Sequence, residues 1–304
     1  METAVQGKIP LPSPGVRFGD DFLGRVERLV ARVRSARERR EGSGKGSLQG
    51  VGAEFLGYRP YRPGENLRAV DWSLFARLDR PFVRVARREA SERWAVLVDR
   101  SASMAVGRPG KLQAAAELAT AIASLGLTVG ASVELVLSPG AGAGRPRSLL
   151  LRKKVELPSW LAFLEEARAE GDRGVAALVQ EPARFRGAGR VFVLGDLLDL
   201  EHDALFGLAR RGRELLCAQL LAPEELTPST AGDGELGRAL VWVDAESGAR
   251  HALELDARTR DRYEAVLRRR LERWRVACAR HRVAFGTWSS ATPFEDVCTG
   301  LFPG

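Results

Sequence analysis

The stretch that most constrains the fold is a short apolar run that ends in a polar loop. Residues 95–98 show no polar alternation, and Asp99 follows at once, with Ser101 and Ser103 at alternate positions after it. Such a run is typical of a central strand covered on both faces. Residues 111–125 then turn helical, rich in alanine and leucine. The stretch therefore predicts half of a β–α–β unit, where ligands lie beyond the carboxyl ends of the strands.

The polar loop has the chemistry of a site for a hard cation. One carboxylate and two hydroxyls suit Mg²⁺ or Mn²⁺ rather than zinc. A second apolar run, residues 191–195, also ends in a carboxylate, Asp196, which faces Asp99 if the two strands are neighbours. The competing interpretation is a helix start capped by serine or aspartate, which is far commoner for clusters of this kind.

The Asp-x-Ser-x-Ser spacing resembles the metal-ion-dependent adhesion site of von Willebrand factor A domains. The resemblance implies that a threonine and an aspartate from later loops complete the metal's shell, with Asp196 as the aspartate. At the threonine position this chain has Arg173. A guanidinium cannot ligate a cation, but it can pair with the carboxylates of Asp99 and Asp196 and so take the place of the metal ion. Two alternatives stay open: Arg173 fills the site, or it points to solvent and water takes the vacant position.

Composition limits the classes of function. With 304 residues and 45% hydrophobic content, the chain can build one large domain or two modest ones. No stretch qualifies as a membrane span, and residues 1–20 lack the apolar segment of a signal peptide, so we expect a cytosolic protein. Three widely spaced cysteines predict reduced thiols. The net charge of +8 suggests nucleic-acid binding as one possible function. This is the minority interpretation, because the basic residues are spread along the chain.

Residues 50–88 mix arginine with aromatic side chains in an unusual way. The residues concerned are Arg59, Tyr61, Arg62, Arg68 and Trp72. Such a mixture can stack on bases or bind phosphates. The alternative is a structured loop, pinned by proline and by arginine pairs with Glu65 and Asp71, and the spacing alone favours this alternative.

Three motifs in a fixed order point to a family. Residues 59–72 read Arg-Pro-Tyr-Arg-Pro-Gly-Glu-Asn-Leu-Arg-Ala-Val-Asp-Trp, residues 75–77 read Phe-Ala-Arg, and residues 98–104 read Val-Asp-Arg-Ser-Ala-Ser-Met. This order resembles the fifty-eighth family in the catalogue of domains of unknown function, whose core is von Willebrand factor A-like. The resemblance implies a partner, a MoxR-type AAA+ ATPase, and a role in chaperoning or assembling other proteins.

We therefore expect an α/β fold with a von Willebrand factor A-like, Rossmann-like, mostly parallel sheet flanked by helices. Residues 1–47 are expected to form a lead-in, a helix and a Gly/Ser linker. Residues 48–93 are expected to form a small β-rich lobe together with a late hairpin at 236–256. Residues 94–304 are expected to form the von Willebrand factor A-like domain.

The expected function is that of a non-enzymatic protein-interaction module, because no general base, nucleophile or nucleotide-binding loop is evident. One alternative is a metal-dependent phosphoryl hydrolase built on Asp99. Haloacid dehalogenase-type enzymes need a second carboxylate two residues on, where this chain has Ser101. The other alternative is nucleic-acid binding through the arginine-rich surface.

Overall fold

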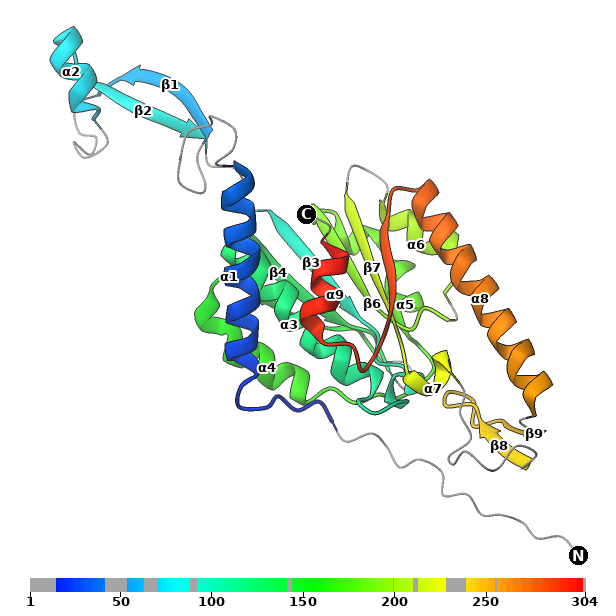
Figure 1. Cartoon of the computed structure of the whole chain (residues 1–304). Helices are drawn as coiled ribbons and strands as arrows, with labels where there is room; N and C mark the ends of the chain where they lie inside the picture. The colour runs from blue at the N-terminus through cyan, green and yellow to red at the C-terminus, as the bar shows by residue number, and fades with distance from the viewer. Residues whose placement is uncertain are drawn as a thin grey trace, which may run out of the picture.

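A six-stranded sheet forms the centre of the molecule (Figure 1). The computed structural model describes residues 15–41, 54–62, 70–87, 92–140, 144–198, 200–209, 213–227, 239–254 and 256–302. The strands are, in spatial order, β10 (Ala284–Ser289), β7 (Glu214–Leu221), β6 (Arg190–Gly195), β3 (Arg93–Val98), β4 (Ser132–Leu137) and β5 (Arg147–Leu151). Neighbouring strands are parallel except β5, which runs antiparallel to β4. The expected α/β class with a mostly parallel sheet is confirmed.

Strand β3 is apolar throughout because both of its faces are covered. Trp94, Val96 and Val98 pack into the core on one face of the sheet, and Ala95 and Leu97 pack into the core on the other. Burying an aliphatic side chain of this size stabilises the fold by about 1.5–3 kcal/mol. A strand with a solvent-exposed face would instead have alternated apolar and polar residues.

Helices cover both faces of the sheet (Figure 1). The Trp94 face packs against α1 (Phe22–Glu41), α3 (Lys111–Thr128), α4 (Leu157–Glu165) and α9 (Phe294–Leu301). The opposite face packs against α5 (Val175–Val179), α6 (His202–Ala209) and α8 (Ala257–Arg280), and the short α7 (Pro223–Leu226) follows β7. In the part of the chain that the structure describes, no helix is long and apolar enough to cross a bilayer. All three cysteines are free and buried, as predicted for reduced thiols.

Helix α1 belongs to the main body. Its residues Phe22, Val26 and Leu29 join the core on the α3 side of the sheet. Arg25 adds a bidentate ion pair, with both bonds to Glu295 of α9 at 2.7 Å. The expected boundary at residue 47 therefore does not separate this helix from the domain, because the helix carries its own apolar face onto α3. The expected Gly/Ser linker lies outside the described residues.

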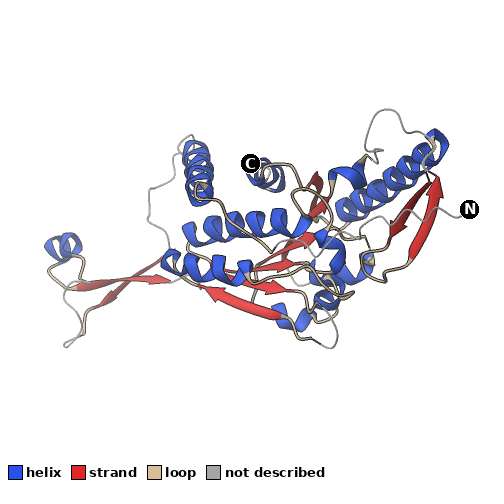
Figure 2. Ribbon diagram, turned by 90° about the horizontal axis from the view of Figure 1, so that it is seen from below, coloured by secondary structure: helices blue, strands red, loops and turns tan. Residues whose placement is uncertain are grey.

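Two small hairpins project from opposite ends of the molecule (Figures 1 and 2). The first, called the arm here, contains β1 (Glu54–Pro60), α2 (Trp72–Leu78) and β2 (Phe82–Arg87). The second pairs β8 (Ala239–Val243) with β9 (Arg250–Glu254). Each forms its own two-stranded antiparallel sheet. The prediction that they share one lobe is wrong, because each hairpin pairs its strands locally.

Candidate functional site at the ends of β3 and β6

Side chains that follow β3 and β6 meet at the carboxyl edge of the sheet. Ser103 Oγ donates to Asp196 Oδ2 at 2.7 Å, and Ser101 Oγ lies 3.1 Å from Ser103 Oγ. The two strands are adjacent and parallel, so their loops leave the sheet on the same side. Asp99, Ser101 and Asp196 are all buried. The structure thus brings Asp99, Ser101, Ser103 and Asp196 together at the carboxyl ends of β3 and β6, as predicted.

Asp99 is held by backbone amides. Its Oδ1 accepts from the N–H of Ser101 at 2.8 Å, and its Oδ2 accepts from the N–H of Val175 at 3.0 Å. Burial, followed by the negative charge of Asp196, raises the pKa of Asp99, and the amide hydrogen bonds oppose the rise. A Cβ atom on Gly174 would lie 2.5 Å from Asp99 Oδ2, so only glycine lets the start of α5 come this close.

Lys111 is a functional candidate that sequence analysis missed. Its side chain has no exposed surface, and its Nζ lies 2.9 Å from Asp196 Oδ2 and 2.7 Å from Glu225 Oε1. Burial alone would lower the pKa of Lys111, but the charges and hydrogen bonds of Asp196 and Glu225 outweigh it and raise the pKa. The available signal was a lysine, rare in this arginine-rich chain, at the start of an apolar helix.

Arg173 does not fill the site. The side chain is exposed, and the backbone of Arg173 pairs with Gly140 in an isolated bridge. The hydrogen bonds to the Asp99 carboxylate come from Ser101 and Val175, and Asp196 is contacted by Ser103 and Lys111. The interpretation in which Arg173 replaces a metal is therefore wrong, because the backbone turn places the Val175 amide, not the guanidinium, against Asp99. We call Asp99, Ser101, Ser103, Lys111, Asp196 and Glu225 the strand-end cluster.

Arg100 fastens the loops around this cluster. Its buried guanidinium donates from Nε to the carbonyl oxygen of Ser138 at 2.7 Å and from Nη1 to Glu170 Oε1 at 2.7 Å. Nη2 also donates to the carbonyl oxygen of Pro139. A planar group with five N–H donors can hold several acceptors at once in a fixed geometry. Arg100 therefore ties the loops after β4 and before α5 to the loop after β3.

Those of the remaining predicted site residues that the structure describes belong to the arm, which projects away from the central sheet (Figure 1). Asp71 caps α2 by accepting from the N–H groups of Ser73 and Leu74 at 3.1 and 3.0 Å, and it accepts from the Tyr58 hydroxyl at 3.0 Å. Trp72 is 58% exposed. The contacts of Asp71 agree with the structured-loop interpretation of this segment.

The other arm residues divide between described and undescribed parts of the chain. Arg59 Nη1 donates to the carbonyl oxygen of Pro60 at 3.2 Å, and the N–H of Tyr61 donates to Pro81 at 2.9 Å. Arg62 is exposed. Glu65 and Arg68 lie outside the described residues.

Comparison with known proteins places the chain in a family. The family model described as "Protein of unknown function DUF58" matches residues 57–273. The chain belongs to the DUF58 family. The match spans part of the arm, the strand-end cluster and much of α8, so the family resemblance in the sequence is confirmed.

This DUF58 protein is similar to two mycobacterial proteins that are each named as an uncharacterized protein. Proteins of Mycobacterium bovis and Mycobacterium tuberculosis are each 31% identical over 226 residues, which is 71% of this chain and 68% of each relative. Among solved structures, the conserved hypothetical protein BatB from Bacteroides thetaiotaomicron aligns at 14% identity with a TM-score of 0.44. That alignment covers 69% of this chain and 96% of BatB.

Proposed function

We propose that this DUF58 protein is a non-catalytic protein-interaction module whose contact surface is built on the strand-end cluster. The observation that carries the proposal is the convergence of the Ser101, Ser103 and Asp196 oxygens at the sheet edge where α/β folds bind ligands. The cluster combines three carboxylates, those of Asp99, Asp196 and Glu225, with one ammonium group, that of Lys111. A net negative charge remains for a cation or a cationic group of a partner to neutralise.

The residues of the cluster fit a hard divalent cation. Neighbouring oxygen ligands in an octahedron around Mg²⁺, each about 2.1 Å from the ion, are about 3.0 Å apart. The separations of 3.1 Å from Ser101 Oγ to Ser103 Oγ and 2.7 Å from Ser103 Oγ to Asp196 Oδ2 are close to that edge length. Ser101, Ser103 and Asp196 would hold Mg²⁺ or Mn²⁺, and Asp99 would add negative charge. The bound ion would offer an open position to a carboxylate of the partner.

Metal affinity should be weak. Within the described residues there is no group of three or more histidine, cysteine or acidic side chains placed to hold a metal, so neutral serine hydroxyls must take part. The ammonium of Lys111, 2.9 Å from Asp196 Oδ2, also offsets part of the charge that attracts an ion. Affinity for hard cations falls as the number of charged ligands falls.

We propose a MoxR-type AAA+ ATPase, or a client protein of such an ATPase, as the partner, in chaperone-like assembly of other proteins. Family membership and the motifs at residues 59–72 and 98–104 support this part of the proposal. The hydrolase alternative is less well supported, since both oxygens of Asp99 already accept backbone hydrogen bonds. A nucleophile committed to two amides is poorly placed to attack phosphorus.

Calorimetric titration of Mg²⁺ and Mn²⁺ into metal-free protein tests the metal. We expect one weakly bound ion, a loss of binding of about tenfold or more in Ser103→Ala, and no change in Ser159→Ala, an exposed serine of α4. Equal binding by native protein and Ser103→Ala would contradict the assignment. Binding of a purified MoxR-type ATPase to native protein and to Asp196→Asn, each with and without EDTA, then tests the partner. Identical binding in all four measurements would overturn the role of the cluster.

A further inference from the structure

Among the residues that the structure describes, helix α8 packs against the body along one side. Trp274 and Cys278 are buried, and they lie one turn apart on the side that faces α6 and β10. Tyr263, about three turns from Trp274 toward the N-terminus, donates its hydroxyl to the carbonyl oxygen of Glu225 at 2.7 Å. These residues share one face of the helix, since positions three, four, seven and eight apart lie on the same side.

The opposite side of α8 carries a stripe of alternating character, which we call the outer stripe. Its residues, spaced three or four apart, are Arg262, Val266, Arg269, Arg273, Val276 and Arg280. The stripe spans roughly 27 Å at the rise of an α-helix. Its four arginines are exposed, and Val266 is 55% exposed.

No acidic residue of α8 interrupts the outer stripe. Asp261, Glu264 and Glu272, the acidic residues of this helix, lie to its sides at other positions of the helical turn. Glu272 is also neutralised by Arg275, which makes two bonds to its carboxylate at 2.7 and 2.8 Å. The stripe therefore presents positive charge around the exposed Val266 and the half-buried Val276.

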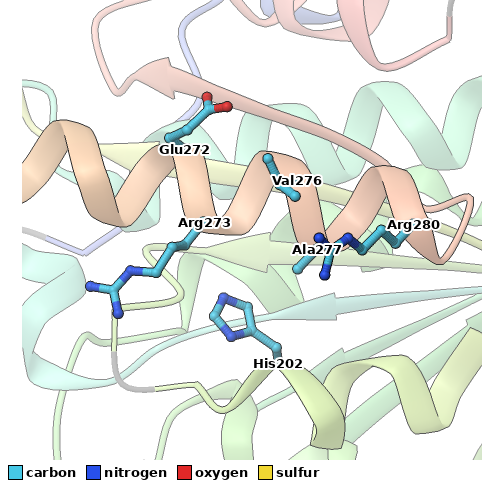
Figure 3. A pocket seen from close by; sticks show the side chains of 6 residues that line it. All are labelled: His202, Glu272, Arg273, Val276, Ala277 and Arg280. Carbon is cyan, nitrogen blue, oxygen red and sulfur yellow. The ribbon is translucent and has the colours of Figure 1, made fainter.

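A cavity of about 400 Å³ opens beside the C-terminal half of the stripe (Figure 3). It is lined by His202, Glu272, Arg273, Val276, Ala277 and Arg280. The His202 ring packs against Trp274, with 4.2 Å between ring centroids, and its Nε2 is buried without a hydrogen-bond partner among the described residues. The cavity thus combines a ring surface with the guanidinium groups of Arg273 and Arg280, while the Glu272 carboxylate in its lining is paired with Arg275; this suits a side chain with an apolar stem and a carboxylate.

We propose that the outer stripe is a docking surface for an acidic amphipathic helix of a partner protein. Carboxylates on that helix would pair with Arg269, Arg273 and Arg280, and its apolar side chains would cover Val266 and enter the cavity beside His202. Charge complementarity and the one-turn spacing of the stripe fit a helix lying alongside another helix. This surface lies on a different element from the strand-end cluster, so the proposal stands independently of the function proposed above.

Two other classes of partner fit the outer stripe less well. Single-stranded nucleic acid needs aromatic side chains on which bases stack, and the stripe has none. A helix that lies in a membrane surface turns bulky apolar side chains outward, whereas Trp274 of α8 is turned into the core. The exposed Val266 between Arg262 and Arg269 is suited to burial against a protein.

The test measures binding by fluorescence anisotropy, with the full chain as receptor. The probe is a labelled helical peptide of about 20 residues, long enough to follow the stripe, with glutamates flanking a leucine row. A peptide with glutamine in place of every glutamate is its control. The receptor variants are Arg269→Gln with Arg273→Gln, and the matched pair Arg260→Gln with Arg268→Gln, which removes equal charge elsewhere on α8. A uridine oligonucleotide and vesicles of phosphatidylcholine with phosphatidylglycerol are tested in parallel.

We expect saturable one-to-one binding of the glutamate peptide at about 0.1 M salt. Affinity should fall at least about tenfold in the Arg269/Arg273 variant and less than about twofold in the Arg260/Arg268 variant. Val266→Asp should also weaken binding, and Asp196→Asn in the strand-end cluster should not. Equal loss in the two arginine variants, equal binding of the glutamine peptide, or tighter binding of the oligonucleotide or vesicles would overturn the proposal.

Discussion

Lys111 Nζ lies 2.9 Å from Asp196 Oδ2 at a position where the lysine side chain has no contact with solvent. The same ammonium group binds Glu225 at 2.7 Å, so one buried cation joins α3, the loop after β6 and α7. Glu225 in turn accepts from the backbone N–H of Ala222 at 2.7 Å. The ammonium thus holds together the loops that position the strand-end cluster.

Replacing Lys111 with methionine should lower the free energy of unfolding by about 3–5 kcal/mol, because removing one partner of a buried pair leaves an uncompensated charge. Urea unfolding measures the change. Arg275→Ala, which breaks an exposed pair with Glu272, is the control and should leave the free energy of unfolding nearly unchanged, because water screens an exposed pair. Adding Asp196→Asn and Glu225→Gln to Lys111→Met should recover part of the loss. A cost below about 1 kcal/mol for Lys111→Met would contradict the buried-pair account.

Asp99 should make stability depend on pH. Its pKa in the folded protein is raised by burial and by Asp196 above the unfolded value of about 3.9. Between the two pKa values the folded protein binds more protons than the unfolded chain, so stability falls as pH rises through that window. Asp99→Asn should remove this fall, as seen in urea unfolding measured across pH.

Asp256 provides the contrast of opposite sign. Hydrogen bonds from Thr259, one of them at 2.6 Å from its N–H, lower the pKa of Asp256. Its stabilising contribution is present above the unfolded pKa and is lost as pH falls through the folded pKa. Asp256→Asn should therefore remove a loss of stability at acid pH. The same measurement, equilibrium urea unfolding across pH, is made on both variants. If both variants change the pH dependence of stability in the same direction, the assignment for Asp99 is refuted.

Gly174→Ala should destabilise the protein by about 1–3 kcal/mol. A new Cβ 2.5 Å from Asp99 Oδ2 forces the start of α5 away from Asp99 and breaks the hydrogen bond that the N–H of Val175 donates to this oxygen. Gly207→Ala is the matched control, since nothing lies within 4 Å of a Cβ there and the residue is inside α6. It should raise stability by about 0.5–1 kcal/mol. Thermal unfolding of the two variants should therefore shift in opposite directions, and a shared direction would count against the close approach at Asp99.

Leu29→Ala in α1 should cost about 2–5 kcal/mol, because the side chain is 1% exposed within the core that α1 shares with α3. Leu23→Ala in the same helix is the control, since Leu23 is 38% exposed, and it should cost less than about 1 kcal/mol. Both values come from urea unfolding. Similar small effects of the two substitutions would mean that α1 is not part of the cooperative unit.

The position of the strand-end oxygens could be predicted from the sequence, because a buried strand is visible as an apolar run and the residue that ends the run is visible with it. Asp99 and Asp196 each end an apolar run, and parallel neighbouring strands bring such ends to one edge. Lys111 could not be predicted in the same way. Its position depends on how α3 packs against the sheet, and its partner Glu225 lies 114 residues away.

Arg173 and the two hairpins show where local patterns stop being informative. A guanidinium near two carboxylates is chemically plausible, but one backbone turn decided that the Val175 amide would reach Asp99 instead. The sequence predicted a small β-rich lobe at residues 48–93 and a hairpin at residues 236–256. Their placement at opposite ends of the molecule depends on long-range packing that no local pattern encodes.

The bidentate pair between Arg25 and Glu295 spans 270 positions of the chain. Alongside it, the ring of Phe22 meets the ring of Phe294 at 5.4 Å between centroids. During synthesis on a ribosome, α1 emerges long before α9. Until α9 is made, the side of α1 that contacts α9 stays exposed to solvent. The final closure of this core is therefore a late event in biogenesis, and contacts this distant in sequence are slow to form.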